Sequence, residues 1–241
     1  MQFILTDNRF LFSRHFASLF VAGGILLMLF FFFPAHAQSS LPELVFTWRA
    51  QSAVPEFYDG KALPTPGARV IVSLEVLQQG KRVSLAGETV YWYVDDTLVQ
   101  NTPGAQTVSL RAGDVPGFVR IVRVQVEDFR GTGEVLVKAI RIPTVAPEVV
   151  IDSPFPKNAI ASPSFTLRAL PFFFNVTSPS LLSYAWEVDG ETPIPNDPPS
   201  LVSVNVFNPR PGKTISARVQ IEIPGNVETR ASSETTFRFS Q

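Results

Sequence analysis

Cysteine is absent from the 241 residues, and the only two histidines, His15 and His36, stand near the amino terminus. No disulfide can therefore form, and a lipid-modified cysteine at the start of a mature chain is excluded. Beyond His36 the chain has neither a thiol nor an imidazole. Nucleophile systems built on a Ser-His or Cys-His pair are excluded there, and so are the common zinc sites.

Charge is also scarce, at 17% of the residues, and the 20 Lys and Arg nearly balance the 21 Asp and Glu. Without residues 1–37, which hold Arg9, Arg14 and Asp7, 18 basic and 20 acidic residues remain, a net charge of −2. A chain with this charge and no basic stripe has no attraction for a phosphate backbone, which excludes nucleic acid as a partner.

Motifs for catalysis are missing as well: there is no phosphate-binding glycine loop and no Ser-x-x-Lys spacing. Two carboxylates could still act as in a glycosidase, but nothing in the sequence marks a pair or a cleft. We therefore expect no enzyme, no catalytic residue, no cofactor and no metal site. A carbohydrate-active enzyme is the remaining catalytic alternative.

One long uncharged apolar run, residues 16–33, follows Arg9 and Arg14 and precedes Ala35-His36-Ala37. A basic start, an apolar run and small residues before the cleavage point are typical of a secretory signal peptide, here residues 1–37. The run is also long enough to span a bilayer, so an uncleaved membrane anchor is the alternative. Both place the rest of the chain outside the cytoplasm, in the periplasm or on the cell surface.

After residue 40 no second long apolar run occurs, and apolar residues alternate with others over short stretches. Residues 70–76, 90–94 and 122–126 each direct every second side chain to one apolar face. The 21 prolines and 14 glycines separate such stretches. Short alternating strands, with a turn about every eight to twelve residues, predict an all-β sandwich fold.

The stretch Trp92-x-Val94-Asp95 returns as Trp186-x-Val188-Asp189, at an offset of 94 residues. Two further matches keep the same order, at offsets of 94 and 95: Val108-Ser109 with Val202-Ser203, and Arg123-Val124-Gln125-Val126 with Arg218-Val219-Gln220-Ile221. One sandwich domain takes ~100 residues, so this repeat predicts two tandem domains, residues 41–143 and 146–241. One large sandwich is the alternative.

The stretches Tyr91-Trp92-Tyr93-Val94-Asp95-Asp96 and Tyr184-Ala185-Trp186-Glu187-Val188-Asp189-Gly190 resemble the Y-x-W-x-x-x-D/G strand of PKD-like and other immunoglobulin-like repeats of bacterial surfaces. The whole layout is similar to that of exported two-domain proteins of bacteria. The resemblance implies two tandem immunoglobulin-like sandwiches behind an N-terminal hydrophobic helix. It also implies a role in adhesion, spacing or assembly, without chemistry.

Trp92 and Trp186 are predicted to fill the cores of the two sandwiches, because each shares its strand face with apolar neighbours two residues away. Stacking on a sugar is the alternative function for these rings. Tyr91 and Tyr93 then point to the outer face of the same strand, near Arg123 and Gln125. These residues form either a contact patch or ordinary cross-strand pairs.

Phe172, Phe173 and Phe174 break the alternation, so at least one ring must leave the core face. A contact between the two domains is the favoured interpretation; a partner-binding surface and a bulge in the core are the alternatives. The acids at predicted strand ends, such as Asp95, Asp96 and Asp189, are expected to be solvated turn residues, with calcium binding as the alternative.

These features together indicate a non-catalytic exported protein of the cell envelope or cell surface, which acts as a structural or binding module in adhesion or assembly. The alternative is a membrane-anchored accessory component of a secretion or pilus-like machine. The expected partner is another envelope or surface protein, or a glycan. Contact with the membrane is expected only through residues 16–33, before cleavage or if they are retained.

Overall fold

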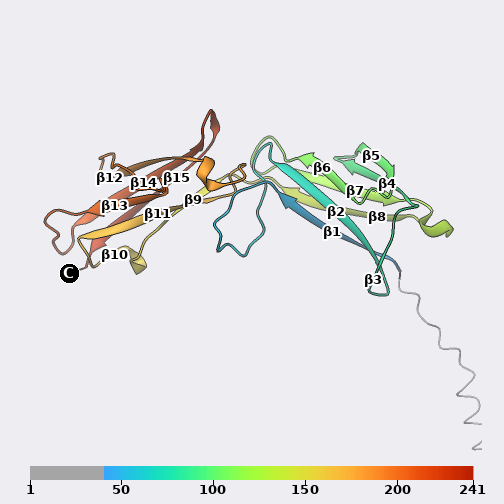
Figure 1. Ribbon diagram of the computed structural model, residues 1–241, viewed down its shortest axis with the longest axis horizontal. Helices are drawn as coiled ribbons and strands as arrows, with labels where there is room; N and C mark the ends of the chain where they lie inside the picture. Colours follow the sequence, from blue (N-terminus) through green and yellow to red (C-terminus); the bar gives the residue numbers. More distant parts are fainter. Residues whose placement is uncertain (1–40, 241) are drawn as a thin grey trace, which may run out of the picture. The chain divides into compact units, whose positions relative to one another are not determined.

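The computed structural model describes residues 41–240, except for the side chains of residues 227 and 228. The predicted signal peptide or anchor, residues 1–37, lies outside the described residues. Within residues 41–240, no helix combines the length and the apolar character needed to cross a membrane. In this described part of the chain the regular structure is almost all strand, in four sheets (Figure 1). The helices there are three 3-10 turns: η1 (Phe129–Gly131), η2 (Pro156–Asn158) and η3 (Pro179–Leu181).

Residues 43–143 form two four-stranded sheets, here called the first sandwich. In one sheet β2 (Arg69–Gln78) pairs with β1 (Glu43–Ala50), β3 (Lys81–Val83) and β6 (Thr107–Arg111). The other sheet has the order β5-β4-β7-β8, made of β5 (Thr97–Pro103), β4 (Thr89–Val94), β7 (Val119–Val126) and β8 (Leu136–Pro143). All of these pairs are antiparallel.

The alternation in the sequence determines which face of each strand is buried in this first sandwich. In β7, Val122, Val124 and Val126 are fully buried, whereas the residues between them are partly exposed. The same holds in β2 for Val70, Val72, Leu74 and Val76. These faces meet around Trp92 in one hydrophobic core, in which each buried side chain contributes roughly 1.5–3 kcal/mol.

Residues 148–239 form the second sandwich, again from two sheets. One sheet has the order β13-β11-β9, made of β13 (Leu201–Asn205), β11 (Ser164–Phe172) and β9 (Glu148–Asp152). The other has the order β10-β15-β14-β12, made of β10 (Ala159–Ile160), β15 (Asn226–Phe239), β14 (Thr214–Ile223) and β12 (Ser183–Val188). The short β10 runs parallel to β15, and the other pairs are antiparallel.

The strand order in each sandwich is that of an immunoglobulin-like domain, in which strands A, B and E face strands C, F and G. In the first sandwich β1-β2-β6 face β4-β7-β8, and in the second β9-β11-β13 face β12-β14-β15. The predicted all-β, immunoglobulin-like architecture is therefore confirmed. The division into two domains stays a prediction, because residues 42–241 form one compact unit.

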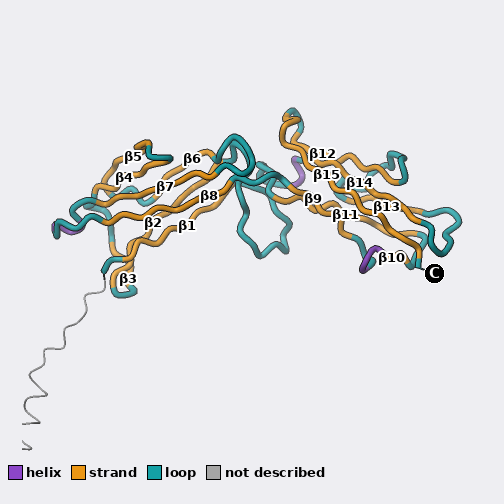
Figure 2. Tube along the Cα trace, turned by 180° about the vertical axis from the view of Figure 1, so that it is seen from behind, coloured by secondary structure: helices purple, strands orange, loops and turns teal. Residues whose placement is uncertain are grey.

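The longest connection in the first sandwich runs from β1 to β2, residues 51–68, and appears as a large teal loop in Figure 2. Ala53 in this loop belongs to the core of the second sandwich rather than to that of the first. The remaining core residues separate along the chain, since those of the first sandwich end at Ile142 and those of the second begin at Val149.

Candidate interaction surface

The repeated Trp-x-Val-Asp stretch builds the same local structure in both sandwiches. Trp92 and Trp186 are 0% and 2% exposed. The Nε1 of Trp92 donates to the carbonyl of Ala105 at 2.8 Å, and that of Trp186 to the carbonyl of Pro199 at 3.2 Å, each thirteen residues further on. Both indoles therefore lie inside the cores, and neither ring is available to stack on a sugar.

The aspartates that end the two stretches also play equivalent parts. Asp95 and Asp189 both have a positive φ, and the Oδ1 atoms accept the backbone N–H of Ile121 at 2.9 Å and of Ser216 at 2.8 Å. Each carboxylate thus ties a turn to the neighbouring strand. Both acids lie in turns, as expected: Asp189 is exposed, and Asp95 is half-buried and also pairs with Arg120. No cluster of His, Cys, Asp and Glu suited to a metal ion occurs among the side chains that the structure describes.

Asp95 is expected to make the stability of the first sandwich depend on pH. Desolvation acts to raise the pKa of Asp95, but the Ile121 N–H and the Arg120 guanidinium, 2.6 Å from Oδ2, outweigh it and lower the pKa below its ordinary 3.8. A carboxyl group whose pKa is lower in the folded than in the unfolded state stabilises the protein at pH values above its unfolded-state pKa. This stabilisation is lost as the pH falls through the folded-state pKa. We expect Asp95→Asn to lose stability at pH 7 and to show less further loss below about pH 4.

Thermal unfolding midpoints measured between about pH 7 and about pH 2.5 test this expectation. Asp96→Asn is the matched control, since the Asp96 side chain is 91% exposed and pairs with Arg123 only at 3.9 Å. The control should follow the wild-type curve. If the thermal midpoint of Asp95→Asn fell with decreasing pH as steeply as that of the wild type, the Asp95 carboxylate would not be the group that links folding to protonation.

The predicted contact residues Tyr91, Tyr93 and Arg123 lie together on the sheet face opposite Trp92. The register pairs Tyr91 with Gln125 and Tyr93 with Arg123, and the Arg123 guanidinium lies 3.8 Å from the centre of the Tyr93 ring. The Nη1 of Arg123 donates to the Oε1 of Gln125 at 3.4 Å. The cation-π contact orients both side chains of the Tyr93–Arg123 pair.

Aliphatic side chains surround this pair. The register places Leu98 of β5 opposite Tyr93, and Val137 of β8 opposite Gln125, while Ile121 precedes Arg123 by two residues on β7. Leu98, Ile121 and Val137 are 46%, 42% and 53% exposed. We call this set the outer face of the first sandwich: Tyr91, Tyr93, Leu98, Ile121, Arg123 and Val137.

The second sandwich has a different surface at the equivalent positions. The strand registers align Tyr91 with Ala185, Tyr93 with Glu187, Ile121 with Ser216 and Val137 with Ser232. Only the basic residue is kept, as Arg218 in place of Arg123. Since the same fold accepts small, hydroxyl and acidic side chains there, the apolar outer face of the first sandwich is not required for folding.

The three phenylalanines predicted as a further contact surface are largely used within the chain. Phe174 is fully buried in the second core, and Phe173 is 8% exposed. The Ala53 N–H donates to the Phe174 carbonyl at 2.7 Å, and the Phe173 N–H donates to the Ala53 carbonyl at 2.8 Å. The Tyr58 ring lies 5.5 Å from that of Phe172 and 5.8 Å from that of Phe173. The loop after β1 covers these rings, so they are not part of the outer face.

Sequence reasoning missed three members of the outer face. Leu98 was missed because no alternating pattern marks residues 97–103 as a strand. Val137 was missed because the sequence does not indicate which side chains of residues 136–143, now β8, face outward. Ile121 could have been predicted, because it lies two residues before Arg123 and so on the same strand face as Arg123 and Gln125.

No protein-family model and no curated protein matches this chain. Solved structures that resemble it include the three N-terminal domains of the bacteriophage RB49 highly immunogenic outer capsid protein (Hoc), at 14% identity and a TM-score of 0.43. That match covers 83% of this chain, which spans 59% of the capsid fragment.

Two other matches are more distant. The fibronectin(III)-like modules of Clostridium thermocellum CbhA are 12% identical, with coverage of 82% of this chain and 95% of theirs and a TM-score of 0.29. The immunoglobulin domains 1–4 of Sidekick-1 are 11% identical, with 83% and 70% coverage and a TM-score of 0.29. At these values the fold assignment rests on the strand order described above.

Proposed function

We propose that the chain is an exported, non-catalytic binding module of the cell envelope or cell surface, which docks to another protein through the outer face of the first sandwich. One observation carries the proposal: the outer face is aromatic and aliphatic, whereas the equivalent positions of the second sandwich are small, polar or acidic. Exposed apolar patches with polar surroundings mark interaction sites more often than they serve the fold.

The chemistry of the outer face favours a protein over a glycan. Arg123 covers one side of the Tyr93 ring at 3.8 Å, which removes that side as a platform for a sugar. Arg141 lies opposite Ile121 on β8, is exposed, and has no ion-pair partner among the described side chains. The partner that fits is a protein surface with an apolar patch and a carboxylate placed opposite Arg141.

Export is proposed from residues 1–37, whose basic start, apolar run and small residues before Gln38 are typical of a signal peptide. A released protein fits a role in adhesion or assembly. A chain that keeps the apolar run fits a membrane-anchored accessory component of a secretion or pilus-like machine. Sequencing of the N-terminus of the exported protein separates the two, since a start at Gln38 indicates release.

Site-specific photo-crosslinking in the native cell tests the docking surface. A photoreactive amino acid at Val137, which is 53% exposed, should give a covalent adduct with one partner protein. The photoreactive amino acid placed at Ser232, the equivalent position of the second sandwich, should give no adduct, because the surroundings there are polar.

Exchange variants provide the control on the same crosslinker. Tyr93→Glu combined with Ile121→Ser introduces the residues of the second sandwich, and the Val137 adduct should fall about tenfold or more. Equal adducts from positions 137 and 232, or an adduct unaffected by the exchange, would contradict docking at the outer face. The thermal midpoint of the exchange variant should stay within a few degrees of wild type, because the replaced side chains are outside the core.

A further inference from the structure

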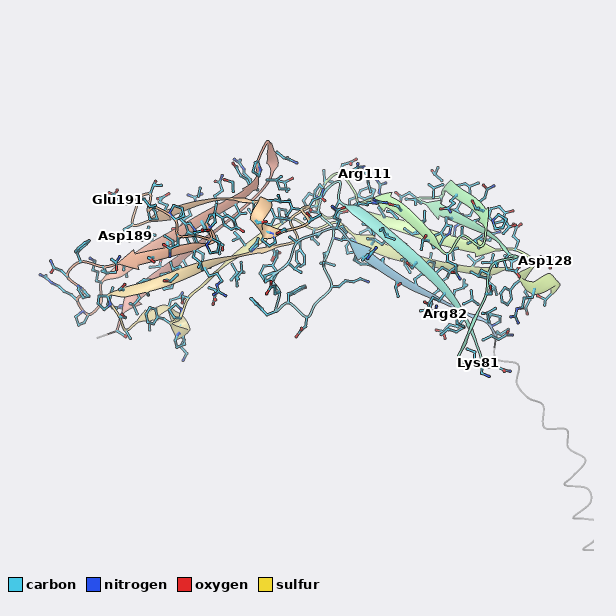
Figure 3. All side chains as sticks on the ribbon, viewed as in Figure 1. Lys81, Arg82, Arg111, Asp128, Asp189 and Glu191 are labelled. Carbon is cyan, nitrogen blue, oxygen red and sulfur yellow. The ribbon has the colours of Figure 1, made fainter. Side chains whose placement is uncertain are left out.

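A pocket of about 380 Å³ opens at the end of the second sandwich where β12 finishes. Its floor is aliphatic, made by Val188, Val204 and Ile215. Two carboxylates, Asp189 and Glu191, lie at the same end of the sandwich and line the pocket (Figure 3). A pocket with an apolar floor and a few polar groups at its rim has the composition of a side-chain or small-ligand site.

The repeat shows what occupies the corresponding place in the first sandwich. Because Asp95 and Asp189 accept equivalent backbone N–H groups, from Ile121 and Ser216, the strands align residue by residue. The residue before Ile121 is Arg120, and the residue before Ser216 is Ile215. By the same alignment Phe118 corresponds to Lys213.

In the first sandwich the aspartate is neutralised from within the chain. The Nη1 of Arg120 donates to the Oδ2 of Asp95 at 2.6 Å, and the guanidinium lies 4.9 Å from the centre of the Phe118 ring. The Arg120 side chain is only 25% exposed. The arginine thus lies beside an aromatic ring and pairs with Asp95 at this end of the first sandwich.

The second sandwich lacks this arginine. Asp189 keeps the bond from the Ser216 N–H at 2.8 Å, but neither Asp189 nor Glu191 forms an ion pair within residues 41–240. Lys213 also lines the pocket, yet its ammonium donates to the carbonyl of Phe207 at 3.1 Å and not to a carboxylate. In the second sandwich the residues aligned with Arg120 and Phe118, which are Ile215 and Lys213, line the open pocket.

We propose that this pocket binds an arginine side chain of another polypeptide, which takes the part that Arg120 plays in the first sandwich. Its guanidinium pairs with Asp189 and Glu191, its methylene groups cover Val188 and Ile215, and the 85% exposed ring of Phe207 flanks it at the rim. A planar, forked guanidinium suits two carboxylates and an aromatic ring better than a lysine ammonium does. This site is separate from the outer face and does not depend on the docking proposed there.

Titration of the exported chain with N-acetyl-arginine-N-methylamide, followed by the methyl resonances of Val188, Val204 and Ile215, tests the proposal. Saturable shifts in the millimolar range or thereabouts are expected for one side chain. The citrulline derivative, which has the same shape without the charge, should bind about tenfold more weakly or worse. Equal binding of the two compounds would overturn the proposal.

Variants test the assigned partners. Asp189→Asn retains an Oδ1 acceptor for the Ser216 N–H while it removes the charge, and should weaken arginine binding about tenfold. Glu191→Gln should also weaken arginine binding. Lys213→Met should strengthen arginine binding, because it removes a positive charge from the pocket wall. Glu234→Gln, an exposed acid on β15 that does not line the pocket, is the control and should change nothing.

The outcomes separate the possibilities. Binding that is unchanged in both Asp189→Asn and Glu191→Gln, or equally reduced in Glu234→Gln, would show a general charge effect and overturn the assignment. Should Asp189→Asn fail to fold, the opposite shifts expected for Glu191→Gln and Lys213→Met still decide the question. Loss of the crosslink at Val137 has no bearing on this result, because the two sites share no residue.

Discussion

Replacement of Trp186 by alanine is expected to lower the free energy of unfolding of the second sandwich by about 3–5 kcal/mol. The indole is 2% exposed within the second core, and its Nε1 donates to the Pro199 carbonyl at 3.2 Å. Truncation leaves a cavity and removes the donor of that carbonyl. Since the stability of a domain is about 5–15 kcal/mol, this loss removes a large fraction of it. Urea denaturation followed by circular dichroism measures the change.

Trp48 provides the matched control, because it is the third tryptophan of the chain and is only partly buried on β1, with Lys61 3.8 Å from its ring centre. Trp48→Ala should cost clearly less than Trp186→Ala. A Trp186→Ala protein with an unchanged urea midpoint would contradict the role of the indole in the second core.

Replacement of Phe174 by alanine is expected to cost about 3–5 kcal/mol as well. This ring is fully buried in the second core, at the point where the Phe174 carbonyl accepts the Ala53 N–H at 2.7 Å. The lost volume therefore lies beside the contact that the loop of residues 51–68 makes with β11 and the residues after it. Urea denaturation of the protein gives the magnitude of the change.

Phe172→Ala removes the same side chain two positions earlier, where the ring is partly exposed and touches Tyr58 at a centroid distance of 5.5 Å. Its cost should be about 1 kcal/mol, the size of an exposed aromatic contact. Equal costs for the two variants would mean that the three phenylalanines share one environment, in disagreement with their burial in the structure.

The strands that were predicted correctly are those with one strongly apolar face. Residues 90–94 and 122–126 place Val90, Trp92 and Val124 in the core, and the register pairs Trp92 with Val124. This alternation is a local property, so a single sequence reveals it. The repeat of Trp-x-Val-Asp likewise predicted equivalent strands, β4 and β12, because the same residues face the same core in each.

The strands that were missed have weak local signals. β5 (Thr97–Pro103) is an edge strand whose side chains are nearly all exposed, so no apolar face marks it. β3 has three residues and β10 has two, too few to show a period. Pairing with a neighbouring strand forms these elements, and a neighbour cannot be read from local sequence.

The residues of the candidate surface also differ in whether local sequence predicts them. Tyr91, Tyr93 and Arg123 could be assigned to one outer face from period-two alternation alone. Leu98 and Val137 join them only because β5 and β8 pair with β4 and β7. The sequence allowed several locations for the three phenylalanines. In the structure, Tyr58 of the loop of residues 51–68 packs against Phe172 and Phe173.

The sequence by itself determined the all-β class, the two buried indoles and the absence of histidine and cysteine chemistry beyond residue 36, since these follow from composition and from alternation along single strands. Only the tertiary structure decided that the outer face of the first sandwich is apolar, and that Asp189 lacks the arginine that Asp95 has. Both depend on which side chains come together from different strands, and strand register, which sets those neighbours, is a property of the folded chain.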